Sequence, residues 1–324
     1  MSGRPRVVVT RRLPAVIEAQ LDREFEAELN ATDQPLPAEA LRAALGAADA
    51  LLCTVTDRLT AELLATEPLR ARILANYGVG FNHIDIAAAR ARGLVVTNTP
   101  DVLTEDTADD ALLLMLMVAR RAGEGERELR AGRWTGWRPT HLLGTKVSGK
   151  TLGLVGMGRI ARALAQRAGR GLGMRILFHD PVAPPAGLVK SLGAAPREHL
   201  DDLLTEADFV SLHCPATPET RHLMNARRLA LMKPTAFLIN TARGDVVDEQ
   251  ALVQALTTGR IAGAGLDVYE REPAVSPELL QLENVAVLPH LGSATRETRE
   301  AMGLRVLENL RAFFAGAQPR DRVT

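Results

Sequence analysis

The sequence has few cysteines, no excess of either charge and no long apolar run, and each shortage argues against a class of protein. Its only cysteines are Cys53 and Cys214, each at the end of an apolar run. We therefore expect two buried thiols in a reducing compartment, with no disulfide and no metal site. The 39 basic residues balance 39 acidic residues without forming a basic run, so neither nucleic-acid nor membrane-surface binding is expected.

The apolar segments are too short for a membrane protein. The longest run, Ala111–Ala119, cannot cross a bilayer. The first ten residues, MSGRPRVVVT, lack the apolar core of a signal peptide. These features predict a cytoplasmic protein, and 324 residues are enough for about two domains.

The strongest motif lies in Thr151–Ala165, where a short apolar run is followed by a glycine turn and by apolar residues at helical spacing. Gly156 would allow the tight turn. Gly158 has no side chain, so a pyrophosphate could approach the N–H groups at the start of the helix. The third position of the motif is Ala161, which is small enough to pack closely. A strand, turn and helix packed for structural reasons alone is the alternative.

A second predicted strand, Arg175–His179, ends at Asp180, and 180 − 158 = 22 residues separate this acid from Gly158. The dinucleotide fingerprint places a ribose-binding acid about 20 residues after its glycines. A carboxylate accepts the 2′-hydroxyl of NAD and repels the 2′-phosphate of NADP, so NAD is the predicted cofactor. The alternative is that Asp180 only caps the turn before Pro181.

Strands and helices alternate along most of the chain, which predicts two doubly wound α/β domains with parallel sheets. The middle of the helix predicted over Thr104–Arg121 is apolar all round, so we expect it to be buried between the domains. The last helix, Arg296–Phe314, is expected to return to the first domain. The other predicted helices are Pro14–Leu29, Ala38–Leu45 and Thr60–Leu64, and the strands are Arg6–Thr10, Ala50–Thr54, Ile73–Asn76, Val95–Asn98, Phe209–His213, Ala236–Asn240, Ala262–Val268 and Val285–Leu288.

Three charged residues, Arg243, Glu272 and His290, follow successive predicted strands. In open α/β sheets, ligands bind outside the carboxyl ends of the strands. Singly, each residue has an ordinary alternative as a helix-start cation, a solvated loop acid or a turn histidine. Their joint placement favours a shared site.

The runs around these residues, NTARGDVVDE, GLDVYEREP and LPHLGSAT, occur in order together with GVGFNHID. With these motifs the chain resembles the D-2-hydroxyacid dehydrogenases from about residue 75 to residue 301. The segment RAGRWTGWRPTHLLGTKVSGK is most similar to the glyoxylate/hydroxypyruvate reductases. The resemblance implies a Rossmann cofactor domain, residues 101–289, inserted in a flavodoxin-like substrate domain, residues 1–100 plus 290–324.

The resemblance also implies catalytic roles. His290 would protonate the substrate carbonyl oxygen, Glu272 would orient the imidazole, and Arg243 would hold the carboxylate or polarise the carbonyl. The N–H groups of Val79 and Gly80 would bind the substrate carboxylate. Trp137 would reach into the active site of a partner subunit, which implies a homodimer.

The family's cofactor contacts map onto residues of this chain in the same way. Asp267 is similar to the acid that binds the nicotinamide carboxamide. The reductase branch often prefers NADP and carries a basic residue after the second strand, but this chain has His179-Asp180-Pro181 instead. The implied cofactor-binding residues are Thr107, Gly156, Gly158, Arg159, Ile160, Asp180, Cys214, Pro215, Thr220, Thr241, Ala242, Asp267 and Gly292.

These motifs predict reduction of a small 2-oxo acid, glyoxylate or hydroxypyruvate, to its 2-hydroxy acid. A long phosphoglycerate dehydrogenase would carry a further regulatory domain, and a formate dehydrogenase would have glutamine where this chain has Glu272. A phosphite dehydrogenase or another D-2-hydroxyacid dehydrogenase stays open. So does a protein like the family's transcriptional corepressors, which would sense NADH without efficient turnover.

Overall fold

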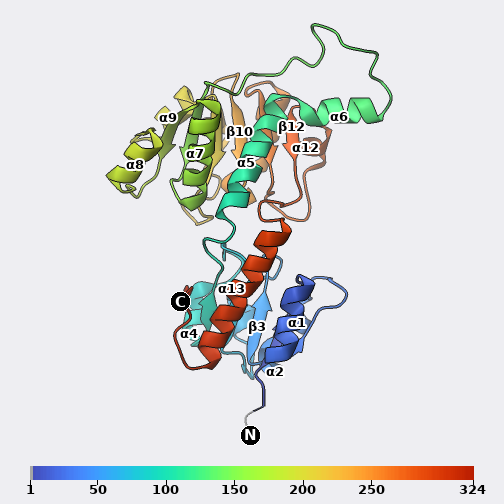
Figure 1. The fold of residues 1–324 in the computed structure, drawn as a ribbon, viewed down its shortest axis with the longest axis vertical. Coiled ribbons are helices and arrows are strands. Elements are labelled where there is room, and N and C mark those ends of the chain that lie inside the picture. Colours follow the sequence, from blue (N-terminus) through green and yellow to red (C-terminus); the bar gives the residue numbers. More distant parts are fainter. Residues whose placement is uncertain (1–2) are drawn as a thin grey trace. The chain divides into compact units, whose positions relative to one another are not determined.

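A computed structural model describes residues 3–324 and divides them into two compact units, each built on a parallel sheet (Figure 1). Unit 1 comprises the chain up to Leu103 together with Ala294–Thr324, and unit 2 comprises Thr104–Ser293. His290 thus belongs to unit 2, whereas the segment that returns to the first domain was expected to begin at this residue. Its N–H donates a hydrogen bond to the carbonyl of Asp267 in the same unit, 2.9 Å away.

Unit 1 has a five-stranded sheet in the order β2-β1-β3-β4-β5, which is the flavodoxin-like order. All residues of β3 and β4 are buried, as expected of central strands covered by helices on both faces. The elements are β1 (Arg6–Val9), α1 (Ala15–Glu24), β2 (Glu26–Glu28), α2 (Ala38–Ala47), β3 (Ala50–Cys53), α3 (Ala61–Leu64), β4 (Ile73–Asn76), α4 (Ile86–Ala91), β5 (Val95–Thr97) and α13 (Arg296–Phe314).

The first helix is shorter than predicted, because α1 ends at Glu24 and β2 pairs with β1. Phe25 leaves the helix with an extended backbone, and its buried ring packs on Phe314 of α13, with 5.9 Å between the ring centroids. The final helix lies in unit 1, as predicted. Gly303 makes its close approach to α1 possible, since a Cβ there would lie 2.5 Å from the Ile17 side chain.

Unit 2 has a seven-stranded sheet in the order β12-β11-β10-β9-β6-β7-β8. This is the Rossmann order with one added strand, so the predicted fold class is confirmed. The short edge strand β8 was not predicted. The elements are α5 (Thr104–Ala119), α6 (Ala122–Arg130), β6 (Thr151–Val155), α7 (Arg159–Leu172), β7 (Arg175–His179), α8 (Ala186–Leu192), β8 (Ala194–Pro196), α9 (Leu200–Glu206), β9 (Phe209–Leu212), α10 (Ala226–Leu229), β10 (Phe237–Asn240), η1 (Gly244–Val246), α11 (Glu249–Thr257), β11 (Gly263–Leu266), α12 (Pro277–Gln281) and β12 (Val285–Val287).

The helix α5 was expected to be buried because its middle is apolar all round, but only one face of it is buried. Its inner face packs closely on the sheet, where Gly265 leaves room for Leu114. Within unit 2, however, Leu113 and Leu116 are 47% and 37% exposed. The helix α6 was not predicted either. After it, residues 131–146 run outside the helices and strands, and Figure 1 shows them as a long excursion of unit 2.

Both cysteines are free, but only Cys53 is fully buried, so the expectation of two buried thiols was wrong for the partly exposed Cys214. Within residues 3–324, no helix combines the length and the apolar character needed to span a membrane.

Candidate active site

The loop from β6 to α7 has the geometry of a phosphate-binding turn. Gly156 has φ +92°, and a Cβ there would come within 2.9 Å of the carbonyl oxygen of His213. Gly158 is the N-cap residue of α7, and a Cβ at this position would meet no atom within 4 Å. Arg159 and Ile160 begin the helix, and Ala161 is fully buried against the sheet. The open space at the start of a long helix fits an anionic pyrophosphate.

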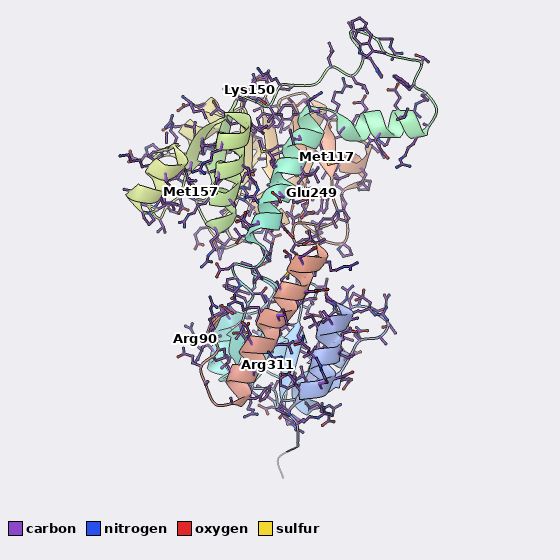
Figure 2. All side chains as sticks on the ribbon, in the orientation of Figure 1. Arg90, Met117, Lys150, Met157, Glu249 and Arg311 are labelled. Carbon is purple, nitrogen blue, oxygen red and sulfur yellow. The ribbon has the colours of Figure 1, made fainter. Side chains whose placement is uncertain are left out.

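Asp180 follows β7 and is tied to this loop. One carboxylate oxygen, Oδ2, accepts a hydrogen bond from the N–H of Met157, 2.7 Å away (Met157 is labelled in Figure 2). The other, Oδ1, accepts from the N–H of Val182 at 2.8 Å. Asp180 therefore does cap the turn after β7. A carboxylate oxygen has two lone pairs, so the cap leaves acceptor capacity for a ribose hydroxyl.

The residues predicted to lie on the adenosine side of the cofactor form a loop that is held by hydrogen bonds between its own residues. The Thr220 hydroxyl donates to the carbonyl of Pro215 at 2.6 Å and accepts from the N–H of Thr217 at 2.8 Å. Burial raises the pKa of Cys214 to about 11. The side chain at the end of β9 is therefore a neutral thiol at physiological pH.

The turn after β10 presents Arg243 and is held by Asn240, the last residue of the strand. The Asn240 side chain is 1% exposed; its amide donates to the carbonyl of Arg243 at 2.9 Å, and its oxygen accepts from the N–H of Ala242 at 3.0 Å. The Thr241 hydroxyl is buried and has no hydrogen-bond partner among residues 3–324. A buried unpaired hydroxyl beside this turn fits the predicted contact with the nicotinamide ribose.

Gly244 brings the Arg243 turn against the loop that carries Glu272. A Cβ at Gly244 would lie 1.9 Å from the carbonyl carbon of Tyr269, so only glycine permits this backbone contact. Burial lowers the pKa of Arg243, and the charges of Glu272 and Asp245 oppose that shift. Arg243 and Glu272 are therefore close enough to interact electrostatically.

His290 and Glu272 form a hydrogen-bonded pair, with 2.8 Å between His290 Nδ1 and Glu272 Oε2. The second carboxylate oxygen accepts from the N–H of Tyr269 at 3.0 Å. Burial raises the pKa of Glu272, but the hydrogen bond and charge of His290, the Tyr269 N–H and the charge of Arg243 together lower it below its ordinary value. Glu272 is therefore a carboxylate, and its bond to Nδ1 leaves Nε2 of His290 available to a substrate.

Asp267 fixes the backbone that carries His290. His290 has φ +56°, a left-handed conformation that costs energy in a residue with a Cβ. The Asp267 carbonyl accepts from the His290 N–H at 2.9 Å, and its carboxylate accepts from the N–H groups of Leu291 and Gly292 at 2.5 and 2.9 Å. Thr107 adds a hydrogen bond from its hydroxyl to the Gly292 carbonyl at 2.9 Å. The strained histidine backbone is thus held by four hydrogen bonds.

Asp110 is a functional candidate that the sequence patterns did not predict. It lies on α5 and is 8% exposed. Burial, together with the charge of Asp267 and a hydrogen bond to it, raises the pKa of Asp110 to about 7, against the charge of His290. In the sequence, Asp110 is one of several acids near the start of a helix. Nothing local sets it apart, because its partner Asp267 lies more than a hundred residues further along the chain.

The loop that carries Glu272 is also braced from α11. The N–H of Glu270 donates to Glu249 Oε2 at 3.1 Å, and the N–H of Ser276 donates to Glu249 Oε1 at 3.2 Å (Glu249 is labelled in Figure 2). Tyr269 links this loop to the strand before His290, through its hydroxyl and the carbonyl of Leu288 at 2.8 Å. These contacts fix both members of the histidine–carboxylate pair.

The strand order of unit 2 lines up the predicted residues. All the strands are parallel, so their carboxyl ends lie at one edge of the sheet. Two residues predicted to bind substrate, Val79 and Gly80, follow β4 in unit 1, and Trp137 lies in the segment after α6 with 82% of its surface exposed. The predicted residues of unit 2 each follow a strand at its carboxyl end. In the order of the sheet from β7 to β12 they are Asp180, the glycine turn, Cys214, Thr241 to Arg243, Asp267 and His290.

This arrangement combines a glycine turn typical of dinucleotide binding, a hydrogen-bonded carboxylate–histidine pair and an arginine on one sheet edge. It can donate a proton and hold an anion beside a bound dinucleotide. Across residues 3–324, no group of three or more histidine, cysteine or acidic side chains is placed to hold a metal ion.

The chain is similar over nearly its whole length to reductases of small 2-oxo acids. A curated glyoxylate reductase from Thermococcus kodakarensis is 48% identical over 320 residues, which cover 98% of this chain and 95% of that protein. The solved glyoxylate reductase from Paecilomyes thermophila has a TM-score of 0.87 at 32% identity and covers 100% of this chain and 99% of its own. An NADPH-dependent glyoxylate/hydroxypyruvate reductase from Sinorhizobium meliloti, solved with NADP and malonate, has a TM-score of 0.88 at 37% identity, covering 99% of this chain and 97% of its own.

A sequence profile also matches most of unit 2. Its description is D-isomer specific 2-hydroxyacid dehydrogenase, NAD binding domain, and it covers residues 112–292. This range includes the glycine turn and the histidine–carboxylate pair. It is more than half of the chain, and the relatives above extend the match over both units. The chain therefore belongs to the D-isomer specific 2-hydroxyacid dehydrogenase family.

Proposed function

We propose that this protein uses NADH to reduce glyoxylate or hydroxypyruvate to the corresponding 2-hydroxy acid. The observation that carries the proposal is the His290–Glu272 pair, which lies beside Arg243 at the carboxyl edge of a Rossmann sheet. The names of the relatives, glyoxylate reductase and glyoxylate/hydroxypyruvate reductase, support this substrate class.

His290 is the proposed proton donor. The nicotinamide supplies the hydride when it is bound. Nε2 of His290 would give its proton to the carbonyl oxygen of the substrate, and would take it back in the reverse direction. The ionised Glu272 accepts the Nδ1–H, which fixes the ring orientation and stabilises the charged imidazole. Asp267 would bind the carboxamide end of the cofactor, next to the histidine backbone that it already holds.

Arg243 and the turn after β4 are the proposed anchors of the substrate. The guanidinium carries a fork of donors that matches a carboxylate or polarises the carbonyl oxygen. The N–H groups of Val79 and Gly80 would bind the carboxylate. Fixing the acid in this way would present one face of its carbonyl carbon to the hydride.

We propose NAD in preference to NADP because of Asp180. Its carboxylate can accept the 2′-hydroxyl of the adenosine ribose, whereas a 2′-phosphate would meet a like charge. The remaining contacts of the cofactor would be those implied by the resemblance. Two free cysteines also support a reducing compartment, the cytoplasm.

We further propose a homodimer in which Trp137 contacts the substrate site of the partner subunit. The indole is 82% exposed within its own chain. A pocket lined by Leu116, Arg120 and residues 141–148 lies where the segment after α6 returns toward the sheet, and Leu143 in its lining is 65% exposed. Apolar surface that gathers in one place marks an interaction site, and a second copy of this chain is the proposed partner.

The proposal is tested by the loss of NADH absorbance with glyoxylate, hydroxypyruvate and pyruvate, and by its gain with phosphite and NAD. Preferential turnover of glyoxylate or hydroxypyruvate supports it. NADH formation with phosphite alone identifies the alternative dehydrogenase. Tight NADH binding without turnover of any of these compounds identifies a nucleotide-sensing protein.

A further inference from the structure

All three carbonyl groups of the turn Gly78–Gly80 are held by hydrogen bonds within unit 1. The side-chain amide of Asn76 donates to the carbonyls of Gly78 and Gly80, each at 3.0 Å. The amide of Asn98 donates to the carbonyl of Val79 at 2.9 Å. The carbonyl of Gly78 also accepts from the N–H of Thr99 at 3.0 Å.

Holding a carbonyl fixes the direction of the N–H group in the same peptide unit. In a trans peptide these two groups point in opposite directions. The bond from Asn76 to the Gly78 carbonyl therefore directs the N–H of Val79, and the bond from Asn98 to the Val79 carbonyl directs that of Gly80. Neither of these N–H groups has an acceptor within the described part of the chain, and both residues are partly exposed.

Asn76 is itself fixed in orientation. It is the last residue of β4 and is 0% exposed. Its side-chain oxygen lies 3.1 Å from Nε2 of His83, which has to donate because the oxygen is an acceptor. The amide nitrogen therefore faces the two carbonyls, and both of its hydrogens are used. A carboxylate or a hydroxyl at this position could not make the same pair of bonds.

We propose that Asn76 is a positioning residue for the substrate carboxylate: by holding the Gly78 carbonyl it aims the N–H of Val79 at the anion, and its second bond, to the Gly80 carbonyl, fixes the far end of the turn. This inference rests on the proposed function, because it takes the turn to be the carboxylate site. Asn76 does not touch the substrate. Its effect is to present a donor already oriented, so that the turn does not have to reorganise when the anion binds.

Asn98 holds the neighbouring peptide unit with a single hydrogen bond, whereas Asn76 makes two to the turn. Loss of the Asn98 amide should therefore have a smaller effect than loss of the Asn76 amide. Its backbone is held independently, by the carbonyl of Asp321 at 3.2 Å and by the amide of Asn309 at 3.4 Å. Changing its side chain therefore removes one bond to the turn and leaves its own position fixed.

The test compares three isosteric substitutions. Asn76→Asp keeps the side-chain shape and the acceptor for His83 but loses both donors, so the KM for glyoxylate should rise about tenfold or more. Asn98→Asp loses one donor and should raise KM less. Asn30→Asp is the matched control, because the Asn30 amide also donates to two carbonyls, those of Thr10 and Gln34, each at 2.7 Å. Its KM should stay at the wild-type value.

Two further measurements separate positioning from a general structural role. The Kd for NADH, followed by nucleotide fluorescence, should change less than about twofold in all three variants, because unit 2 carries the nucleotide turn. Calorimetric binding of oxamate, an unreactive analogue, to the NADH complex should weaken with the same rank order as KM. If Asn76→Asp does not fold, Asn76→Ser, which keeps one donor, carries the test with an intermediate rise in KM.

The inference is overturned if Asn76→Asp, or Asn76→Ser in its place, keeps the wild-type KM and oxamate affinity. It is equally overturned if Asn30→Asp raises KM as much, or if NADH affinity falls in parallel with KM. A wild-type enzyme that neither reduces the 2-oxo acids nor binds oxamate contradicts the proposed function instead.

Discussion

In each unit, one strand ends in a buried asparagine whose side chain holds the following turn, but the two turns offer different chemical groups. β4 in unit 1 reads ILAN and β10 in unit 2 reads FLIN, and each ends in a buried asparagine. Asn76 holds the carbonyls of a glycine turn, while Asn240 holds the backbone of the turn that carries Arg243. The first turn offers backbone N–H groups, and the second offers a charged side chain.

The difference predicts a division of labour between the turns. Backbone N–H groups carry fixed dipoles and do not titrate, so the unit 1 turn can hold an anion at any working pH. The groups that titrate or carry formal charge around the chemistry, namely His290, Glu272, Arg243, Asp267 and Asp110, all belong to unit 2. Changes at the unit 1 turn should therefore affect substrate affinity without altering the pH profile, and changes at the titrating groups of unit 2 should affect the rate and its pH dependence.

The largest effect is expected from His290→Ala. A positioned general acid typically contributes about 10²–10⁴-fold to rate, so kcat/KM for glyoxylate should fall by that range, mainly through kcat. The Kd for NADH should stay near the wild-type value, which serves as the control for folding. Steady-state kinetics measures the change. A variant that keeps its kcat would remove His290 from the reaction and end the proposed division between the units.

The next effect concerns the two glycines that flank the turns. Gly244→Ala would place a Cβ 1.9 Å from backbone atoms of Tyr269, and such atoms cannot move cheaply. We expect the free energy of unfolding to fall by about 1–3 kcal/mol or more, with loss of activity as the Glu272 loop shifts. Gly78→Ala is the matched substitution in unit 1, because its Cβ would meet nothing closer than 3.7 Å.

Urea unfolding of both glycine variants decides the point. If Gly78→Ala were as destabilising as Gly244→Ala, the close packing behind Arg243 would not be a special property of unit 2.

Much of the fold and three members of the site could be predicted from the sequence, because their signals are local. The glycine turn, the apolar strands and the runs around Arg243, Glu272 and His290 each lie within a few residues. The edge strand β2 was missed because its three residues, Glu26–Glu28, continue an amphipathic pattern after α1. The segment after α6 gave no periodic signal beyond its two tryptophans.

The supporting residues could not be predicted, because their partners are distant in the sequence. Asp110 becomes unusual only beside Asp267, and nothing in the acidic run around it distinguishes it from its solvated neighbours. For Asn76 and Asn240 the sequence shows only a weak pattern, in which an asparagine ends an apolar strand just before a turn. That pattern becomes informative once the structure shows which carbonyls each amide holds.

A smaller effect, specific to pH, is expected at Asp110. Its pKa is about 7 in the folded chain and about 3.9 when unfolded, so between these values the folded state holds a proton that the unfolded state has released. This contribution makes the free energy of unfolding fall as pH rises from about 4 to about 7, and it is constant above that. Asp110→Asn removes the titration and can still donate to Asp267.

Thermal unfolding at several pH values measures this prediction. The free energy of unfolding of Asp110→Asn minus that of the wild type should be smallest near pH 4 and should increase until about pH 7. A difference that does not change with pH would mean that Asp110 titrates normally.

The smallest effect on stability is expected from Trp137→Ala, because an indole that is 82% exposed contributes little to its own chain. The melting temperature of the isolated chain should hardly change. If the indole completes a partner's site, the same substitution raises the KM for glyoxylate several-fold, shifts light scattering toward the monomer, or both. Trp134→Ala, with an indole 51% exposed in the same segment, is the control. A fully active wild-type monomer, or an unchanged KM in Trp137→Ala, would confine the substrate site to residues of a single chain.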